Sequence, residues 1–203
     1  MYESKALTRE TLQQSVNALD PRKEVTLALV DMDHFDHVNS HFGTDSGDQV
    51  LETLEKLLLQ SLPEGALVAR VGGDEFALAL PEYSPESTLI LLSEIQAHFL
   101  GYSDLLTPKF KLTFSAGIAS RPAHARDFPS LLQAADEALY RIKTEKRGSI
   151  GIYVEAKMVL KSNYYPKASL ERLSRIASAQ KRTEASLLRE ALETLLTRYS
   201  DQV

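Results

Sequence analysis

Two groups of acidic residues stand next to apolar stretches, where their side chains can meet and do chemistry. Asp31, Asp33 and Asp36 crowd six positions, and Asp74 and Glu75 stand side by side after a pair of glycines. Like charges at this density are unfavourable unless a cation or a basic partner neutralises them. Mg2+ (or Mn2+) prefers oxygen ligands and keeps several waters, so two carboxylates and a phosphate would suffice to hold it. The pattern therefore predicts a divalent metal site.

The second acidic group lies at the turn of an expected hairpin over residues 66–80. Gly72 and Gly73 are expected to let the backbone turn tightly and to leave room for a nucleotide. The two carboxylates that follow can then face Asp31 across a neighbouring strand. An isolated acidic hairpin turn is as often merely solvated, so the interpretation depends on the two acidic groups each adjoining a buried strand.

Length and composition indicate a globular protein. The 203 residues can form one ordinary domain and a small second one, and 43% of them are hydrophobic. The absence of cysteine excludes disulfides and thiolate metal sites. The N-terminal residues lack a signal-peptide pattern, and no apolar stretch approaches the roughly 20 residues of a membrane span. We therefore expect a cytoplasmic protein that does not enter a membrane.

The charge divides the chain into two parts. Residues 1–155 carry 14 basic and 23 acidic residues, whereas residues 156–203 carry 9 basic and 5 acidic residues. A basic tail on an acidic body is often only a solvated helix. Its positive charge is nevertheless compatible with nucleic acid as a partner.

Hydrophobic periodicity predicts alternating helices and strands in the acidic part. Helices and strands mixed in this way predict an α/β (α+β) sandwich with a mixed sheet. The expected helices are 8–19, 46–62, 84–100 and 127–147, and the expected strands are 24–32, 66–71, 76–80, 109–120 and 148–154.

Three separated motifs in the acidic part resemble one known family. They are "DMDHFDHVNSHFGTDSGD" at 31–48, "GGDEF" at 72–76 and "ADEALYRIK" at 135–143. In this order they resemble the catalytic domain of the GGDEF family, the diguanylate cyclases, over about residues 5–155. The resemblance implies a palm-like nucleotidyl cyclase fold with a β-hairpin active site. It also implies condensation of two GTP molecules to cyclic di-GMP with Mg2+ (or Mn2+).

The resemblance also implies roles for individual residues. Asp74 and Glu75 match the two catalytic signature acids. A metal would be held by Asp31, Asp74 and the backbone carbonyl of Met32. The implied GTP-binding residues are Asn39 and Asp48, which would read guanine, together with Phe35, Gly72, Gly73, Lys143 and Arg147.

Several positions depart from the family pattern. Asp36 stands where the family has a lysine, which reverses a charge close to the expected phosphates. Ser40 and Thr44 replace a usual aspartate and a usual histidine. Residues 63–66 read "PEGA" in place of the R-x-x-D of members that are inhibited by their product, so no such inhibitory site is expected.

The basic tail predicts two short helices over residues 170–196, with Thr183 as the N-cap of the second. An extended segment over 157–166 precedes them. A strand followed by two helices resembles the ribbon-helix-helix DNA-binding fold, which pairs two chains in an intertwined homodimer. The candidate contacts to double-stranded DNA are Lys161, Ser162, Asn163, Tyr164, Lys181, Arg182 and Thr183. The alternative is a dimerisation clamp that binds no DNA.

The sequence thus predicts a diguanylate cyclase domain at 1–155 and a ribbon-helix-helix domain at 156–203. Three functions stay open. The first is a dimeric diguanylate cyclase placed on DNA by its tail. The second is a sensor of GTP or a cyclic dinucleotide that regulates a ribbon-helix-helix repressor, which the charge reversal at Asp36 favours. The third is a purely structural dimer.

Overall fold

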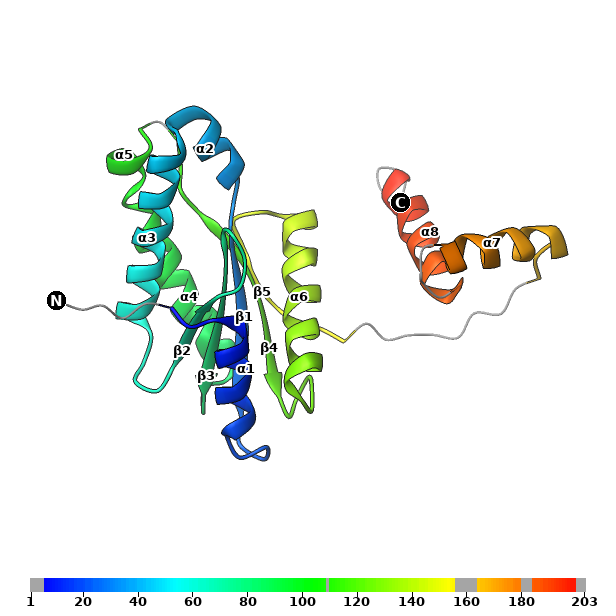
Figure 1. Cartoon of the computed structure of the whole chain (residues 1–203), viewed down its shortest axis with the longest axis horizontal. Helices are drawn as coiled ribbons and strands as arrows, with labels where there is room; N and C mark the ends of the chain where they lie inside the picture. Colours follow the sequence, from blue (N-terminus) through cyan, green and yellow to red (C-terminus); the bar gives the residue numbers. More distant parts are fainter. Residues whose placement is uncertain (1–5, 109, 156–163, 180–183, 200–203) are drawn as a thin grey trace. The chain divides into compact units, whose positions relative to one another are not determined.

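The computed structural model describes residues 6–108, 110–155, 164–179 and 184–199 (Figure 1). The chain divides into two compact units, residues 1–156 and 157–203. No helix in these described ranges is both long and apolar enough to cross a membrane.

A five-stranded sheet forms the centre of the larger unit. Its strands lie in the order β2-β3-β1-β4-β5. β1 is antiparallel to both β3 and β4, β2 and β3 form an antiparallel hairpin, and β4 and β5 are parallel. The predicted mixed sheet is therefore confirmed. The strands are β1 (Val25–Met32), β2 (Leu67–Arg70), β3 (Glu75–Pro81), β4 (Phe114–Arg121) and β5 (Ile150–Ile152).

Local capping signals fix the start of the predicted helices. Thr8 and Ser84 accept backbone N–H groups in the first turns of α1 (Arg9–Ala18) and α4 (Pro85–Leu100), and Asp127 forms a capping box at α6 (Phe128–Glu145). α3 (Thr44–Ser61) also lies where the sequence predicts a helix.

The sequence does not predict two of the helices, and two strands are markedly shorter than predicted, the last being Ile150–Ile152 instead of 148–154. The unpredicted α2 (Phe35–Phe42) follows His34, which is left-handed and supplies no side-chain cap, so its start has no sequence signal. The unpredicted α5 (Ser103–Leu106) is a single turn. The strand predicted at 109–120 begins only at Phe114, because the preceding backbone is tied elsewhere: Leu112 N–H donates to Ser103 Oγ.

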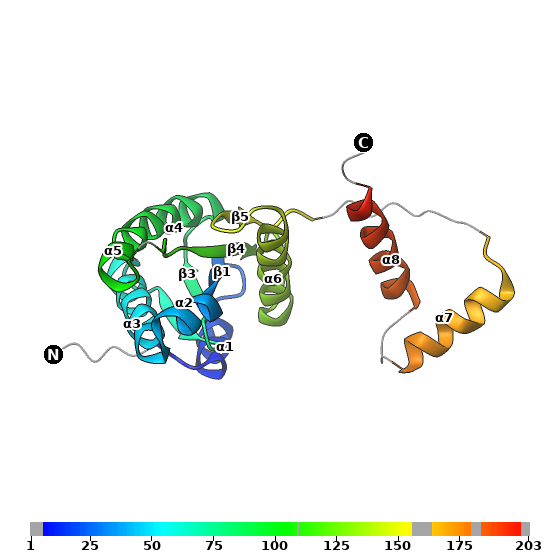
Figure 2. The same cartoon turned by 90° about the horizontal axis from the view of Figure 1, so that it is seen from above.

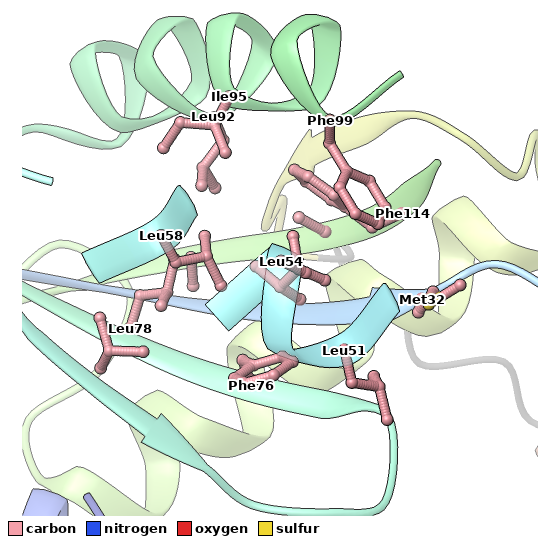
Figure 3. Close-up of a cluster of buried hydrophobic side chains, with 14 of the residues drawn as sticks. Met32, Leu51, Leu54, Leu58, Phe76, Leu78, Leu92, Ile95, Phe99 and Phe114 are labelled. Carbon is pink, nitrogen blue, oxygen red and sulfur yellow. The ribbon is translucent and has the colours of Figure 1, made fainter. Parts of the chain in front are cut away.

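Each face of the sheet carries its own core. Alternate residues of β1 point to opposite faces, as strand geometry requires. Figure 3 shows one core, in which Met32 and Phe76 from the sheet lie with Leu54 of α3 and Leu92 of α4. α1 and α6 cover the other face with a second apolar cluster. Figure 2 shows the sheet with α3 and α4 on one side and α6 on the other.

α6 lies unusually close to β4 at Gly117. A Cβ atom at this position would stand 2.2 Å from both the carbonyl oxygen of Ala135 and the backbone nitrogen of Leu139. Because these are backbone atoms, no rotamer change can make room, and only glycine permits the approach. Gly117 therefore fixes how deeply α6 sits on the sheet.

The smaller unit contains α7 (Lys167–Ala179) and α8 (Glu184–Arg198), the two helices that the tail pattern predicts. Among its described residues only Ala177 is buried. Most large apolar side chains of the two helices are exposed, namely Leu170, Ile176, Leu188, Leu192, Leu195 and Leu196. Of the DNA-contact candidates, Tyr164 is described and exposed. The others lie outside the described residues, namely Lys161, Ser162, Asn163, Lys181, Arg182 and Thr183.

Gly117→Ala should lower the stability of the larger unit by about 3 kcal/mol, because α6 must move off the sheet. Urea unfolding measures this, as a lower midpoint for the variant. Gly73→Ala is the matched control, since a Cβ there meets nothing within 4 Å. Equal midpoints for Gly117→Ala and the unaltered protein would contradict the tight contact.

Candidate active site

The register of the sheet brings two carboxylates face to face. Asp31, near the end of β1, is paired across the antiparallel ladder with Glu75, the first residue of β3. Opposite residues in such a ladder project from the same face. Both positions belong to the face that α6 covers. Residues 44 positions apart in the sequence thus form one acidic site.

The β2–β3 turn places Asp74 beside the end of β1. The N–H of Met32 donates to the carbonyl of Asp74 at 3.2 Å, and Val71 N–H donates to the carbonyl of Glu75. The Arg70 guanidinium donates to the carbonyl of Gly73. These backbone bonds tie the turn to both strands.

The glycine pair serves the site in a different way from that predicted. The backbone turns tightly here, but neither Gly72 nor Gly73 has a positive φ, so a left-handed conformation is not what calls for glycine. Space is the reason instead. A Cβ at Gly72 would lie 3.2 Å from Cβ and 3.3 Å from Oε2 of Glu75, whereas Gly73 faces open space. Gly72 therefore leaves the Glu75 side chain its room.

Lys143 of α6 reaches the same site. Its Nζ lies 2.5 Å from Oδ2 of Asp31, and the two side chains are 28% and 14% exposed. A hollow of about 310 Å3 lies alongside, lined by Glu75, Asp136, Glu137, Leu139, Tyr140 and Lys143. The structure thus places Lys143 on a carboxylate, whereas the sequence predicts contacts with phosphates.

Burial and nearby negative charges raise the pKa of both facing carboxylates. Burial is the main cause that raises the pKa of Asp31 above its ordinary value, against the opposing effect of Lys143. Burial likewise raises the pKa of Glu75, and the charge of Asp31 raises it further. The site therefore holds more negative charge than its surroundings compensate, which suits the binding of a cation.

The all-oxygen donor set fits a hard divalent ion such as Mg2+ or Mn2+ better than softer metals such as Zn2+ or Cu2+, which prefer nitrogen and sulfur ligands. No three aspartate, glutamate or histidine side chains of the described residues converge into a complete metal cage. Mg2+ does not need such a cage, since it is commonly bound by one or two carboxylates with phosphate oxygens and water. Asp31, Asp74 and the carbonyl of Met32 are the groups that would hold it.

The three carboxylates of the first acidic group have different surroundings in the structure. Asp33 is buried, and its Oδ1 accepts the Ser115 hydroxyl at 2.7 Å. Gly148 N–H donates to the same hydroxyl oxygen, which anchors the turn that carries the exposed Arg147. Asp36 is exposed in the first turn of α2, where a negative charge is favourable. Of the three, Asp31 is the one that pairs with Glu75, and the charge of the buried Asp33 still acts on Asp31.

The guanine-reading candidates lie on two packed helices. Asn39 belongs to α2, and Asp48 belongs to the first turns of α3. A Cβ at Gly47 would lie 1.9 Å from Asn39 Oδ1 and 3.3 Å from Cε2 of Phe35. The structure therefore brings Phe35 and Asn39 together against the residue before Asp48. Gly47 and Ser115 carry no sequence signal for these contacts, although Gly47 lies within the motif at 31–48.

The comparisons with known proteins identify one family. The diguanylate cyclase GGDEF domain profile matches residues 3–149. The chain is 34% identical over 128 residues to the diguanylate cyclase DgcM of Escherichia coli K12, covering 63% of this chain and 30% of DgcM. It is 36% identical over 137 residues to the diguanylate cyclase TpbB of Pseudomonas aeruginosa, covering 66% and 31%. The match thus spans about a third of these relatives.

Two solved structures show the same architecture. The active GGEEF domain of a Vibrio cholerae diguanylate cyclase matches with a TM-score of 0.68 and 26% identity, covering 75% of this chain and all of that chain. The GGDEF domain of Caulobacter crescentus DgcB in complex with c-di-GMP matches with a TM-score of 0.62 and 26% identity, covering 71% and 86%.

Glu75→Gln should raise the thermal unfolding midpoint at pH 7 by roughly 2–4 °C. Because the pKa of Glu75 is raised in the folded state, its charged form costs stability, and this cost grows as pH rises through the raised pKa. The difference between variant and unaltered protein should therefore vanish below about pH 4. Glu94→Gln, at an exposed glutamate of α4, serves as control. A Glu75→Gln midpoint at or below that of the unaltered protein at pH 7 would refute this assignment of charge.

Proposed function

This chain belongs to the GGDEF family, and on that premise we propose that residues 1–155 condense two GTP molecules to cyclic di-GMP. The pairing of Asp31 with Glu75 at one end of the sheet is the observation that carries the proposal. This pairing provides two carboxylates with raised pKa values, beside a turn that leaves open space at Gly73.

Each residue of the site has a chemical task in this proposal. When bound, Mg2+ or Mn2+ supplies charge stabilisation at the triphosphate. Asp31, Asp74 and the Met32 carbonyl hold it. Glu75 is the base that accepts the proton of the attacking 3'-hydroxyl, and its raised pKa suits this task. The 3'-oxygen of each GTP bonds to the α-phosphorus of the other, and two pyrophosphates leave as the ring closes.

Guanine selection is assigned to the α2–α3 pair. The Asp48 carboxylate would accept hydrogen bonds from the N1 and N2 donors of guanine, which adenine cannot supply. Asn39, held against Gly47, would read the same base. Phe35, Gly72, Gly73, Lys143 and Arg147 complete the proposed nucleotide site, with the two basic residues on the phosphates.

One domain binds one GTP, so the proposed reaction requires a homodimer. We assign residues 156–203 to a ribbon-helix-helix domain that supplies the dimer and contacts double-stranded DNA. The exposed leucines of α7 and α8 support this assignment, because a unit of this size cannot bury its apolar faces alone. Tethering two domains raises their effective concentration.

A nucleotide sensor that controls DNA binding is the second candidate function. Asp36 favours it, since this exposed carboxylate stands where the family has a lysine and would repel nearby phosphates. In this function the signature binds GTP or a cyclic dinucleotide without turnover.

Incubation of the full chain with GTP and Mg2+ should yield cyclic di-GMP and pyrophosphate, detected by chromatography and mass spectrometry. Asp74→Ala should lower the rate at least about a hundredfold, because a metal-binding carboxylate is lost. Specific GTP binding without any product would replace the cyclase by the sensor. Product made equally fast by Asp74→Ala would rule out the proposed site.

Leu192→Glu should convert the full chain from dimer to monomer in light scattering, because a charge is placed on an exposed apolar face of α8. It should also abolish salt-sensitive binding to duplex DNA. Ser174→Glu adds the same charge at an exposed polar position of α7 and should leave the dimer intact. A Leu192→Glu dimer as stable as the unaltered one would refute this interface. If the unaltered protein is a dimer that does not bind duplex DNA, the tail is a dimerisation clamp and not a DNA-binding domain.

A further inference from the structure

Lys143 forms an ion pair with Asp31, one of the carboxylates of the proposed metal site. We propose that Lys143 is an internal counter-ion of Asp31, which competes with the divalent ion and is released from Asp31 when metal and nucleotide bind together. The proposal rests on the proposed function of this site and adds to it a coupling between metal and nucleotide.

The contact is close and sheltered. Lys143 Nζ is 2.5 Å from Asp31 Oδ2, and both side chains are largely withdrawn from solvent. Exposed ion pairs contribute little, but partial burial lowers screening and strengthens the attraction. By contrast, the pair of Lys56 with Glu52 on α3 is 69% exposed on each side and spans 3.5 Å.

The fold holds Lys143 in place for this contact. α6 is seated against β4 at Gly117, where only a glycine permits the approach. Lys143 lies in the last turn of this helix, where the helix dipole also favours a cation. The packing of α6 against the sheet therefore positions the Lys143 ammonium next to Asp31.

The lysine and a metal cannot share the same oxygen. Mg2+ binds carboxylate oxygens at about 2.0–2.1 Å, so an ammonium left in hydrogen-bond contact with that oxygen would be strongly repelled. A metal on Oδ2 therefore displaces Lys143, and a metal on Oδ1 is still repelled by the ammonium on the neighbouring oxygen. The adjoining hollow of about 310 Å3, which Lys143 itself lines, provides the space.

This exchange makes metal binding depend on the nucleotide. Metal alone must break the ion pair and leaves the ammonium without its partner. When the triphosphate is present, the released ammonium gains phosphate oxygens and the loss is offset. By linkage, nucleotide and metal then raise each other's affinity by the same factor. Removal of the lysine should strengthen binding of metal alone and weaken this mutual effect.

The test is Mn2+ binding to the full chain without nucleotide, measured from free Mn2+ by electron paramagnetic resonance. Lys143→Met should bind Mn2+ about five- to tenfold more tightly than the unaltered protein, because the competing charge is gone. Lys143→Arg, which keeps the charge, should stay within about twofold of the unaltered protein. Lys56→Met, at the exposed ion pair, should change nothing.

Two further measurements complete the test. Asp31→Asn in the Lys143→Met background should abolish the gain, since the gain operates through that carboxylate. Addition of GTP should improve Mn2+ affinity more in the unaltered protein than in Lys143→Met. Equal or weaker Mn2+ binding by Lys143→Met would overturn the proposal, as would a gain that survives Asp31→Asn.

Cyclic di-GMP formation is measured separately, so the two proposals fail separately. The predicted Mn2+ pattern without product would leave the counter-ion in place and remove the cyclase. Product formation with no tighter Mn2+ binding in Lys143→Met would do the reverse.

Discussion

The register of β1 against β3 is the constraint on which the acidic site depends. β1 is buried on both faces except at Asp31, and its side chains alternate between two separate apolar cores. A slip of one residue would exchange the two sets and drive the Asp31 carboxylate toward the core that contains Val30 and Met32. The free energy of core burial therefore also holds Asp31 opposite Glu75. The fold needs no separate interaction to assemble the pair.

Electrostatics at this site opposes the packing that creates it. Burial and nearby negative charges disfavour the ionised forms of Asp31 and Glu75, and Lys143 only partly offsets this. In the proposed function the site holds a cation and a triphosphate, so its negative charge in the empty state needs a partner that can be exchanged for them. A lysine is suited to such a partner, because its flexible stem lets a point charge move between a carboxylate and other anions.

The sequence predicts what local signals determine. Thr8, Ser84 and Asp127 mark helix starts through their own side-chain bonds, and the continuous apolar run of β1 marks a buried strand. It fails where distant residues decide. α2 starts at a left-handed histidine without a cap, and the partner of Asp33 is a serine 82 residues away. The family resemblance placed Lys143 near the site. Its partner Asp31 lies far earlier in the sequence, so the ion pair could be identified only from the folded structure.

A homodimer would satisfy a requirement of each of the two units of the chain. In the proposed reaction, a single set of Asp31, Asp74 and Glu75 with one bound GTP cannot close a ring made of two nucleotides, so a second copy is a chemical requirement. In the tail, α7 and α8 expose leucines that a second copy can cover, so the same requirement arises there from burial. Because covering these leucines is favourable whether or not GTP is present, the tail would hold two domains together before substrate arrives. Encounter of the two half-sites then becomes intramolecular, which leaves the binding energy of GTP available for positioning the 3'-hydroxyl.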